Sequence, residues 1–391
     1  MNIIIIVLCS LLILAYLGEI SSEHTRIPTV ILLLFMGWLV KQATLMLKVT
    51  IPDLNPILPF FGTIGLILIV LEGTLELRLN RSKIGIVRKS FIMAILPMIF
   101  LSSVFALAFS IFAEVPFRTA LVNALPFAVI SSSIAIPSAK NISPHDREFV
   151  IYESSLSDII GVLFFNFIVV TQTFTIVSGG LFLLQLVLIS LISVFSVIGL
   201  SYILGRIKNH ITYTPILLLV ILVYFIAKAF DLSGLVFIMV LGLFLGNIPR
   251  IRQFYLLERL VKRVDSERLD DEVEKFRVMT IEATFLIRSL FFLLFGFLLS
   301  TEEFINLQTL PWSMGIVIFI FGSRWLFLKL LKLPLSPLLY FSPRGLITIL
   351  LYMSVGAEMS LSFVNNSLLV QVVIISVVIM SSGLLRYKSV D

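Results

Sequence analysis

The chain has 391 residues, of which 59% are hydrophobic and only 13% are charged, and its mean hydropathy is +1.10. This composition excludes a soluble globular protein and indicates an integral membrane protein. The formal net charge of +6 does not imply a nucleic-acid partner, because the basic residues fall in loops between apolar runs.

Taken in chain order, the apolar runs are each close to the length of about 20 residues that a helix needs to cross the hydrocarbon layer. Barrel strands alternate apolar and polar residues, whereas runs such as LFLLQLVLISLISVFSVIGL are apolar on every side. The sequence therefore predicts an all-α polytopic membrane protein with about 13 transmembrane helices, at residues 2–18, 26–43, 57–76, 91–113, 118–138, 147–172, 180–204, 211–229, 233–248, 278–300, 310–331, 337–357 and 366–385.

Lysine and arginine are distributed unevenly around these helices. With the N-terminus outside, 22 of the 29 fall on the inner side and four on the outer side, while Arg288, Arg324 and Arg344 lie within or at the ends of spans. Loops rich in these residues face the cytoplasm. We therefore expect the N-terminus outside and the C-terminus in the cytoplasm, in the cytoplasmic (inner) membrane of a bacterium.

Two predicted spans carry residues that interrupt a helix. The fifth contains VISSSIAIPSAK and the twelfth begins with SPLLYFSPRGLITILL, so the interrupting residues and their polar neighbours are Ser131, Ser132, Ser133, Pro137, Pro337, Pro343, Arg344 and Gly345. Proline lacks a backbone donor, and broken helices at membrane depth are tolerated where they line a cavity or are buried. The two spans cross the membrane in opposite directions. Such a pair is typical of an inverted-repeat secondary transporter, with its site where the breaks cross.

The segment 251–277, IRQFYLLERLVKRVDSERLDDEVEKFR, mixes charges with apolar residues at irregular helical spacing. We interpret it as a cytoplasmic amphipathic connector. Residues 1–250 would then hold the first inverted-repeat half, linker helix seven and the start of the second half. Residues 278–391 would hold the remainder of the second half, including broken helix twelve.

The sixth predicted helix, YESSLSDIIGVLFFN, carries two carboxylates, Glu153 and Asp158. Residues five apart differ by about 140° around a helix, so the two do not share a face. Ser154 lies on the face of Asp158 and Ser157 lies beside Glu153, and a hydroxyl next to a carboxylate offers oxygen ligands to a hard cation. A charge at mid-membrane costs about 2.5–3.5 kcal/mol, so it is paired or hydrated. We expect Glu153 to form a buried ion pair with Arg288, leaving Asp158 as the unpaired titratable group.

Five motifs in chain order resemble the monovalent cation/proton antiporter superfamily, particularly its sodium/proton exchanger branch. LEGTLEL is similar to the F-E-G-G-L of its third helix, which would make Glu72 an acid of the cavity or gate. YESSLSD resembles E-S-L-F-N-D of helix six, and SPRGLI resembles the G-P-R-G of the second broken helix around Arg344. IRSLFFLLFG resembles the arginine-bearing helix that pairs with the helix-six glutamate, and SSSIAI is closer to the S-S-T-A-I of the glutathione-gated potassium efflux branch.

The resemblance implies a sodium/proton antiporter fold in a homodimer, surrounded by membrane lipid, which exchanges a monovalent cation for H⁺ by alternating access and needs no cofactor or transition metal. Na⁺ is the first expectation, and Li⁺ and K⁺ stay open. Asp158 would carry the proton or the cation, with ligands from Ser154, Ser157, Ser131, Ser132 and Ser133. The family's T-D-P aspartate is missing here, and Ser157 replaces the asparagine before the carrier. With Glu153 neutralised, one titrating group remains, which predicts electroneutral exchange.

Two other transport functions stay open on the same fold: a K⁺/H⁺ efflux antiporter and a sodium-coupled organic solute symporter. A symporter would need a larger polar cavity than broken helices poor in Asn, Gln and Tyr provide. A gated efflux system is expected to carry a nucleotide-binding domain, whereas this chain ends about six residues after the last predicted span. An enzyme is not expected, because no cluster of His or Cys lies at membrane depth.

Overall fold

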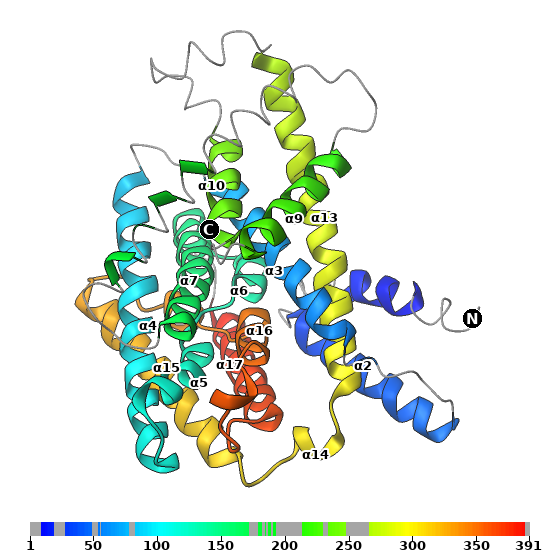
Figure 1. Ribbon diagram of the computed structural model, residues 1–391, viewed down its shortest axis with the longest axis vertical. Helices are drawn as coiled ribbons and strands as arrows, with labels where there is room; N and C mark the ends of the chain where they lie inside the picture. Colours follow the sequence, from blue (N-terminus) through cyan, green and yellow to red (C-terminus); the bar gives the residue numbers. More distant parts are fainter. Residues whose placement is uncertain are drawn as a thin grey trace. The chain divides into compact units, whose positions relative to one another are not determined.

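The structure is a computed structural model that describes residues 9–18, 28–48, 54, 56–77, 83–171, 213–229, 234–247 and 266–387, with a few short stretches between 179 and 192. Every regular element in these residues is a helix (Figure 1). The labelled helices are α2 (Thr29–Met46), α3 (Ile57–Glu76), α4 (Ile84–Ala113), α5 (Phe117–Ala128), α6 (Ser132–Ser138), α7 (Pro144–Val170), α9 (Tyr213–Ala229), α10 (Gly234–Gly246), α13 (Ser266–Leu298), α14 (Thr301–Phe304), α15 (Leu310–Leu330), η2 (Leu338–Tyr340), α16 (Leu346–Met353), η3 (Ala357–Met359) and α17 (Asn366–Arg386).

Eight helical segments in the described part of the chain are long and apolar enough to cross a membrane, with α5 and α6 counted together. They coincide with eight predicted spans, and three shorter apolar helices, Cys9–Gly18, Val220–Ala229 and Gly234–Gly246, fall on three others. Most of the predicted helix at 180–204 lies outside the described residues. The all-helical membrane fold is thus confirmed, whereas the count of thirteen stays a prediction.

The structure describes the connector expected at 251–277 only from Ser266 onward. Residues 251–265 lie outside the described residues, but α13 already begins at Ser266 and continues into the apolar run without a break. The change from charged to apolar residues at 277 and 278 alters what the helix faces, but no proline or glycine stands there to end it. Residues 266–277 of the predicted connector are therefore helical and continuous with the tenth predicted span, whereas the cytoplasmic amphipathic connector itself stays a prediction.

The chain divides into two compact units. The second unit comprises residues 66–84 and 166–285, and includes most of α3, all of α9 and α10, and the first part of α13. Here α10 packs closely on α3, because a Cβ at Gly246 would lie 2.6 Å from the carbonyl oxygen of Leu75. Asn247, which follows α10, donates to the carbonyl of Leu77 at 2.8 Å. Small residues at such contacts let helix backbones approach within a membrane.

The first unit comprises residues 1–65, 85–165 and 286–391. Within it, α2 packs on the end of α13, because a Cβ at Gly296 would come within 2.9 Å of the Leu34 backbone. Lys41 of α2 donates to the carbonyls of Leu298 and Leu299 at 3.0 and 2.9 Å. The last carbonyls of a helix lack intrahelical donors, and a cation there also compensates the helix dipole.

Both interrupted spans belong to the first unit, and both are broken as predicted. Between α5 and α6 the chain is extended, with φ −89° and ψ 116° at Ser131. In the second span, η2 ends at Tyr340 and α16 begins at Leu346. Pro126 lies inside α5 and Pro137 inside α6. That the two spans belong to inverted repeats stays a prediction.

Candidate ion-binding site

The two breaks lie against each other. The backbone N–H of Ser131, in the first break, donates to the carbonyl of Pro343, in the second, at 3.0 Å. A Cβ at Gly345 would lie 2.9 Å from Ser131 Oγ and 2.5 Å from Ile134 Cδ1. Gly345 has extended backbone, with φ −169°, so the requirement for glycine there comes from close approach and not from conformation.

Replacing Gly345 with valine is expected to separate the two breaks. Overpacking a tight contact costs about 1–3 kcal/mol, so the thermal unfolding midpoint in detergent should fall and transport should fall with it. Gly356→Val is the matched control, because a Cβ at Gly356 meets no atom within 4 Å. Equal stability and transport for the Gly345 and Gly356 variants would contradict the tight crossing.

Asp158 of α7 reaches the start of α6. Its side chain is buried, with 2% of its surface exposed, and Oδ2 accepts from Ser132 twice, from the backbone N–H at 3.1 Å and from the hydroxyl. The first N–H groups of a helix have no intrahelical acceptor, so a carboxylate from another helix satisfies one of them. Asp158 Oδ1 has no hydrogen-bond partner in the described part of the chain.

The other predicted ligand serines make different contacts. Ser157 Oγ accepts from the N–H of Ile130 at 3.0 Å, and thereby holds the extended segment between α5 and α6. Ser131 and Ser133 share a hydrogen bond of 2.8 Å between their hydroxyls. Ser154 donates to the carbonyl four residues earlier in its own helix, at 2.8 Å. Their predicted roles as cation ligands stay predictions.

Glu153 is paired with Arg324 of α15 and not with Arg288, so the predicted partner was wrong. The ion pair is bidentate, with Nη1–Oε1 at 2.7 Å and Nη2–Oε2 at 2.9 Å, and both side chains are 2% exposed. Arg324 Nε also donates to the carbonyl of Leu338 at 2.6 Å. Arg288 of α13 instead donates to the carbonyl of Ser133 at 3.3 Å. The reason is helix packing, because α15 is the helix that brings a guanidinium to Glu153.

Arg344, predicted only as the cation of the second break, binds the end of α5. It is 1% exposed, and its guanidinium donates to the carbonyls of Phe127 at 2.6 Å and Ala128 at 3.3 Å, and to the carbonyl and hydroxyl of Ser342, both at 3.0 Å. Phe127 and Ala128 are the last residues of α5, where carbonyls lack intrahelical donors. The break thus has a cation at the carbonyl end of α5 and the carboxylate of Asp158 at the amide end of α6, as helix dipoles favour.

Glu72, the expected acid of a cavity or gate, lies in the part of α3 that belongs to the second unit, and it is half-buried. Its role stays a prediction. Among the described residues, no group of three or more His, Cys, Asp or Glu side chains could hold a metal ion.

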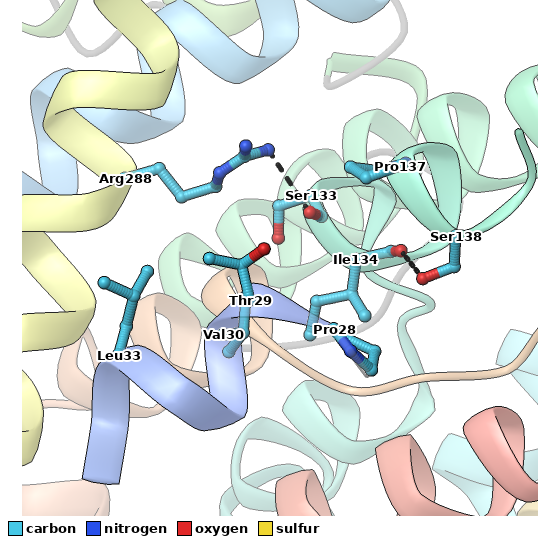
Figure 2. A pocket seen from close by; sticks show the side chains of 9 residues that line it. All are labelled: Pro28, Thr29, Val30, Leu33, Ser133, Ile134, Pro137, Ser138 and Arg288. Carbon is cyan, nitrogen blue, oxygen red and sulfur yellow. Dashed lines mark hydrogen bonds between the residues drawn. The ribbon is translucent and has the colours of Figure 1, made fainter. Parts of the chain in front are cut away.

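Two small pockets flank the crossing within the first unit. One borders Ser157, Arg324, Ser342 and Arg344, and its other walls are Ser323, Ile130 of the first break and apolar residues of α4, α5 and α15. Figure 2 shows the other, between the start of α2, α6 and Arg288 of α13, where Ser133 and Ser138 line the α6 side. Polar side chains of the site are therefore bordered by space on two sides.

Comparison with known proteins agrees with this architecture. The family described as "Sodium/hydrogen exchanger, transmembrane" matches residues 8–335. A structure of the sodium proton antiporter MjNhaP1 from Methanocaldococcus jannaschii at pH 8 is similar, with a TM-score of 0.70, 18% identity and 97% of each chain covered. An electron-microscopy map of the same antiporter gives a TM-score of 0.70, 17% identity and 99% coverage of each chain. No curated protein sequence matches significantly.

Proposed function

Because the chain belongs to the transmembrane sodium/hydrogen exchanger family, we propose that it exchanges Na⁺ for H⁺, with Asp158 carrying each ion in turn. It is a transporter and not an enzyme. The observation that carries the proposal is the state of Asp158, which is buried at the helix breaks with Oδ2 held by Ser132 and Oδ1 without a hydrogen-bond partner in the described residues. Oδ1 is therefore the atom at which a proton or a cation would bind.

Competition at one carboxylate is sufficient for exchange. A bare carboxylate at membrane depth is unfavourable, so Asp158 would cross the occluded state only as a neutral acid or as a carboxylate with a bound monovalent cation. Among the described residues, Glu153 and Asp158 are the buried carboxylates, and Arg324 already neutralises Glu153. This leaves Asp158 as the group whose charge can change during transport.

The surrounding hydroxyls suit a hard cation. The hydroxyls of Ser131 and Ser133 lie within 2.8 Å of each other, and Ser132 contacts Asp158 directly. Oxygen ligands are those that hard cations prefer. We assign Asp158 Oδ1 and hydroxyls of these three serines to the Na⁺ ligand set, with Ser157 holding the adjacent backbone.

The proposal also includes how the site reaches each side of the membrane, how the chain is oriented, and what Glu72 does. Alternating access would move the crossing of α5, α6 and α16 between the two sides of the membrane, within a homodimer in membrane lipid. The basic loops orient the N-terminus outside and the C-terminus in the cytoplasm of a bacterial cell. Glu72 is assigned to the cavity or gate, outside the charge that is exchanged.

The proposal is tested by transport in proteoliposomes. Gradients of Na⁺, Li⁺ or K⁺ are imposed between about pH 6 and pH 9, and proton movement is followed with a trapped dye. We expect Na⁺ to drive proton movement with a bell-shaped pH dependence, because protons fill Asp158 at low pH and too few remain for the return step at high pH. Proton movement that no alkali cation drives would contradict the function, and a response to K⁺ alone would reassign the cation.

Exchange is expected to be independent of membrane potential. One proton for one Na⁺ moves no net charge, whereas one net charge moved across 100 mV corresponds to about 2.3 kcal/mol, or a shift of roughly 50-fold in the final ion ratio. The potential is clamped with K⁺ and valinomycin while the Na⁺-driven pH change is followed to its endpoint. An endpoint that follows the imposed potential would mean that a second group, such as Glu72, also titrates.

A further inference from the structure

The carbonyl of Ser133 in α6 lacks its usual intrahelical donor. In an α-helix this oxygen accepts from the N–H four residues later, and that residue is Pro137, which has none. Ser133 is buried, with 6% of its surface exposed. Buried backbone carbonyls need a partner, so this position requires a donor from another element.

Arg288 supplies that donor. Its Nη1 lies 3.3 Å from the Ser133 carbonyl oxygen, and only 9% of the residue's surface is exposed. Figure 2 shows the guanidinium extending from α13 toward Ser133, with Pro137 on the same short helix. The pocket beside α6 is lined by Thr29, Leu33 and Arg288, so side chains do not fill this side of the helix completely. The hydrogen bond from Arg288 therefore helps to hold α6 in place on the side where side-chain packing is incomplete.

This contact lies one residue from the carrier. Ser132 gives both its N–H and its hydroxyl to Asp158, Ser131 gives its N–H to Pro343, and Ser133 accepts from Arg288. Three consecutive residues are thus each bound by a different element. A rotation of the first turn of α6 that freed the Ser133 carbonyl would also move the two donors on Asp158 Oδ2.

We propose that Arg288 is a positioning residue, which replaces the donor that Pro137 removes and thereby fixes Ser132 against Asp158. The proposal rests on the proposed function, since its consequence is the affinity of Asp158 for the transported cation. A guanidinium suits this position, because its N–H groups all donate and none accepts, which is what a carbonyl oxygen without a donor requires.

The test combines Arg288→Met, Pro137→Ala and the double variant. Arg288→Met removes the donor, and we expect the KM for Na⁺ to rise about tenfold, the effect of losing one charge-assisted hydrogen bond, with a smaller change in maximal rate. Pro137→Ala restores an N–H four residues after Ser133. Alone it should leave the KM for Na⁺ within about twofold of wild type, and in the double variant it should reverse most of the rise in KM caused by Arg288→Met. Arg277→Met is the control, because Arg277 is on the same helix and pairs with Glu274.

Hydrogen–deuterium exchange gives a second readout that does not depend on transport. Peptides covering residues 129–138 should exchange faster in Arg288→Met and return toward wild type in the double variant. An unchanged KM and unchanged deuterium exchange in Arg288→Met would overturn the inference. A rise in KM that Pro137→Ala does not reduce would also overturn it, because the charge of Arg288 and not its hydrogen bond would then matter. A wild-type protein without cation-driven proton movement would overturn the proposed function instead, while deuterium exchange would still decide the contact.

Discussion

Replacing Asp158 with asparagine is expected to reduce cation-driven proton movement to the level of empty liposomes. The amide cannot bind or release a proton in the working pH range, and it carries no charge to offset that of Na⁺. Its oxygen can still accept from the N–H and hydroxyl of Ser132, so the crossing should keep its structure. The measurement is the initial rate of Na⁺-driven pH change in proteoliposomes containing equal amounts of protein.

The matched control is Asp146→Asn at the start of the same helix. Asp146 is half-exposed and accepts from the Ser143 hydroxyl at 2.8 Å, outside the helix breaks, and its variant should transport like wild type. The thermal unfolding midpoint of Asp158→Asn should stay within a few degrees of wild type, since no buried charge is left unpaired. Substantial exchange in a well-folded Asp158→Asn protein would remove Asp158 from the mechanism.

The membrane architecture was largely predictable, because the physical signal is local. A span must be apolar over about 20 residues, and a proline removes its own N–H wherever it occurs. For these reasons the two broken spans could be located from sequence, although the first break lies at Ser131 and α6 continues through Pro137. The start of α13 could not, because a change from charged to apolar residues alters the surroundings of a helix without ending it.

Within the site, residues brought together by neighbouring segments were easier to predict than residues on distant helices. Asp158 and the serines before Pro137 were expected at one place, and Ser132 does contact Asp158. The partner of Glu153 was missed, because both Arg288 and Arg324 are isolated cations among apolar residues. Which of them reaches the carboxylate depends on which helix packs beside α7, and no local pattern carries that information.

The role of Arg344 had a usable signal. A helix that ends at membrane depth leaves its last carbonyls without donors, so the broken fifth span requires donors from elsewhere. Arg344 is the cation of the other break, where the two breaks were expected to cross. That reasoning would have placed its guanidinium on the carbonyls of Phe127 and Ala128, where the structure has it.

Breaking the ion pair between Glu153 and Arg324 is expected to destabilise the protein strongly. Removing one partner of a buried pair leaves an uncompensated charge and costs about 3–5 kcal/mol, whereas replacing both by apolar residues of similar size is often far less costly. Glu153→Leu and Arg324→Met should each lower the thermal unfolding midpoint and the yield of monodisperse protein. The double variant should recover a large part of both, less the hydrogen bond from Arg324 to Leu338.

A second cycle with Arg288→Met separates the two possible pairings. Both carboxylate oxygens of Glu153 are occupied by Arg324, at 2.7 and 2.9 Å, so coupling should appear between Glu153→Leu and Arg324→Met. Arg288→Met combined with Glu153→Leu should give effects that add, because the contact of Arg288 with Ser133 is independent of that carboxylate. Coupling to Arg288 in place of Arg324 would restore the pairing expected from sequence. The cation that neutralises Glu153 would then come from α13 and not from α15. Asp158 would still be the carboxylate left to titrate.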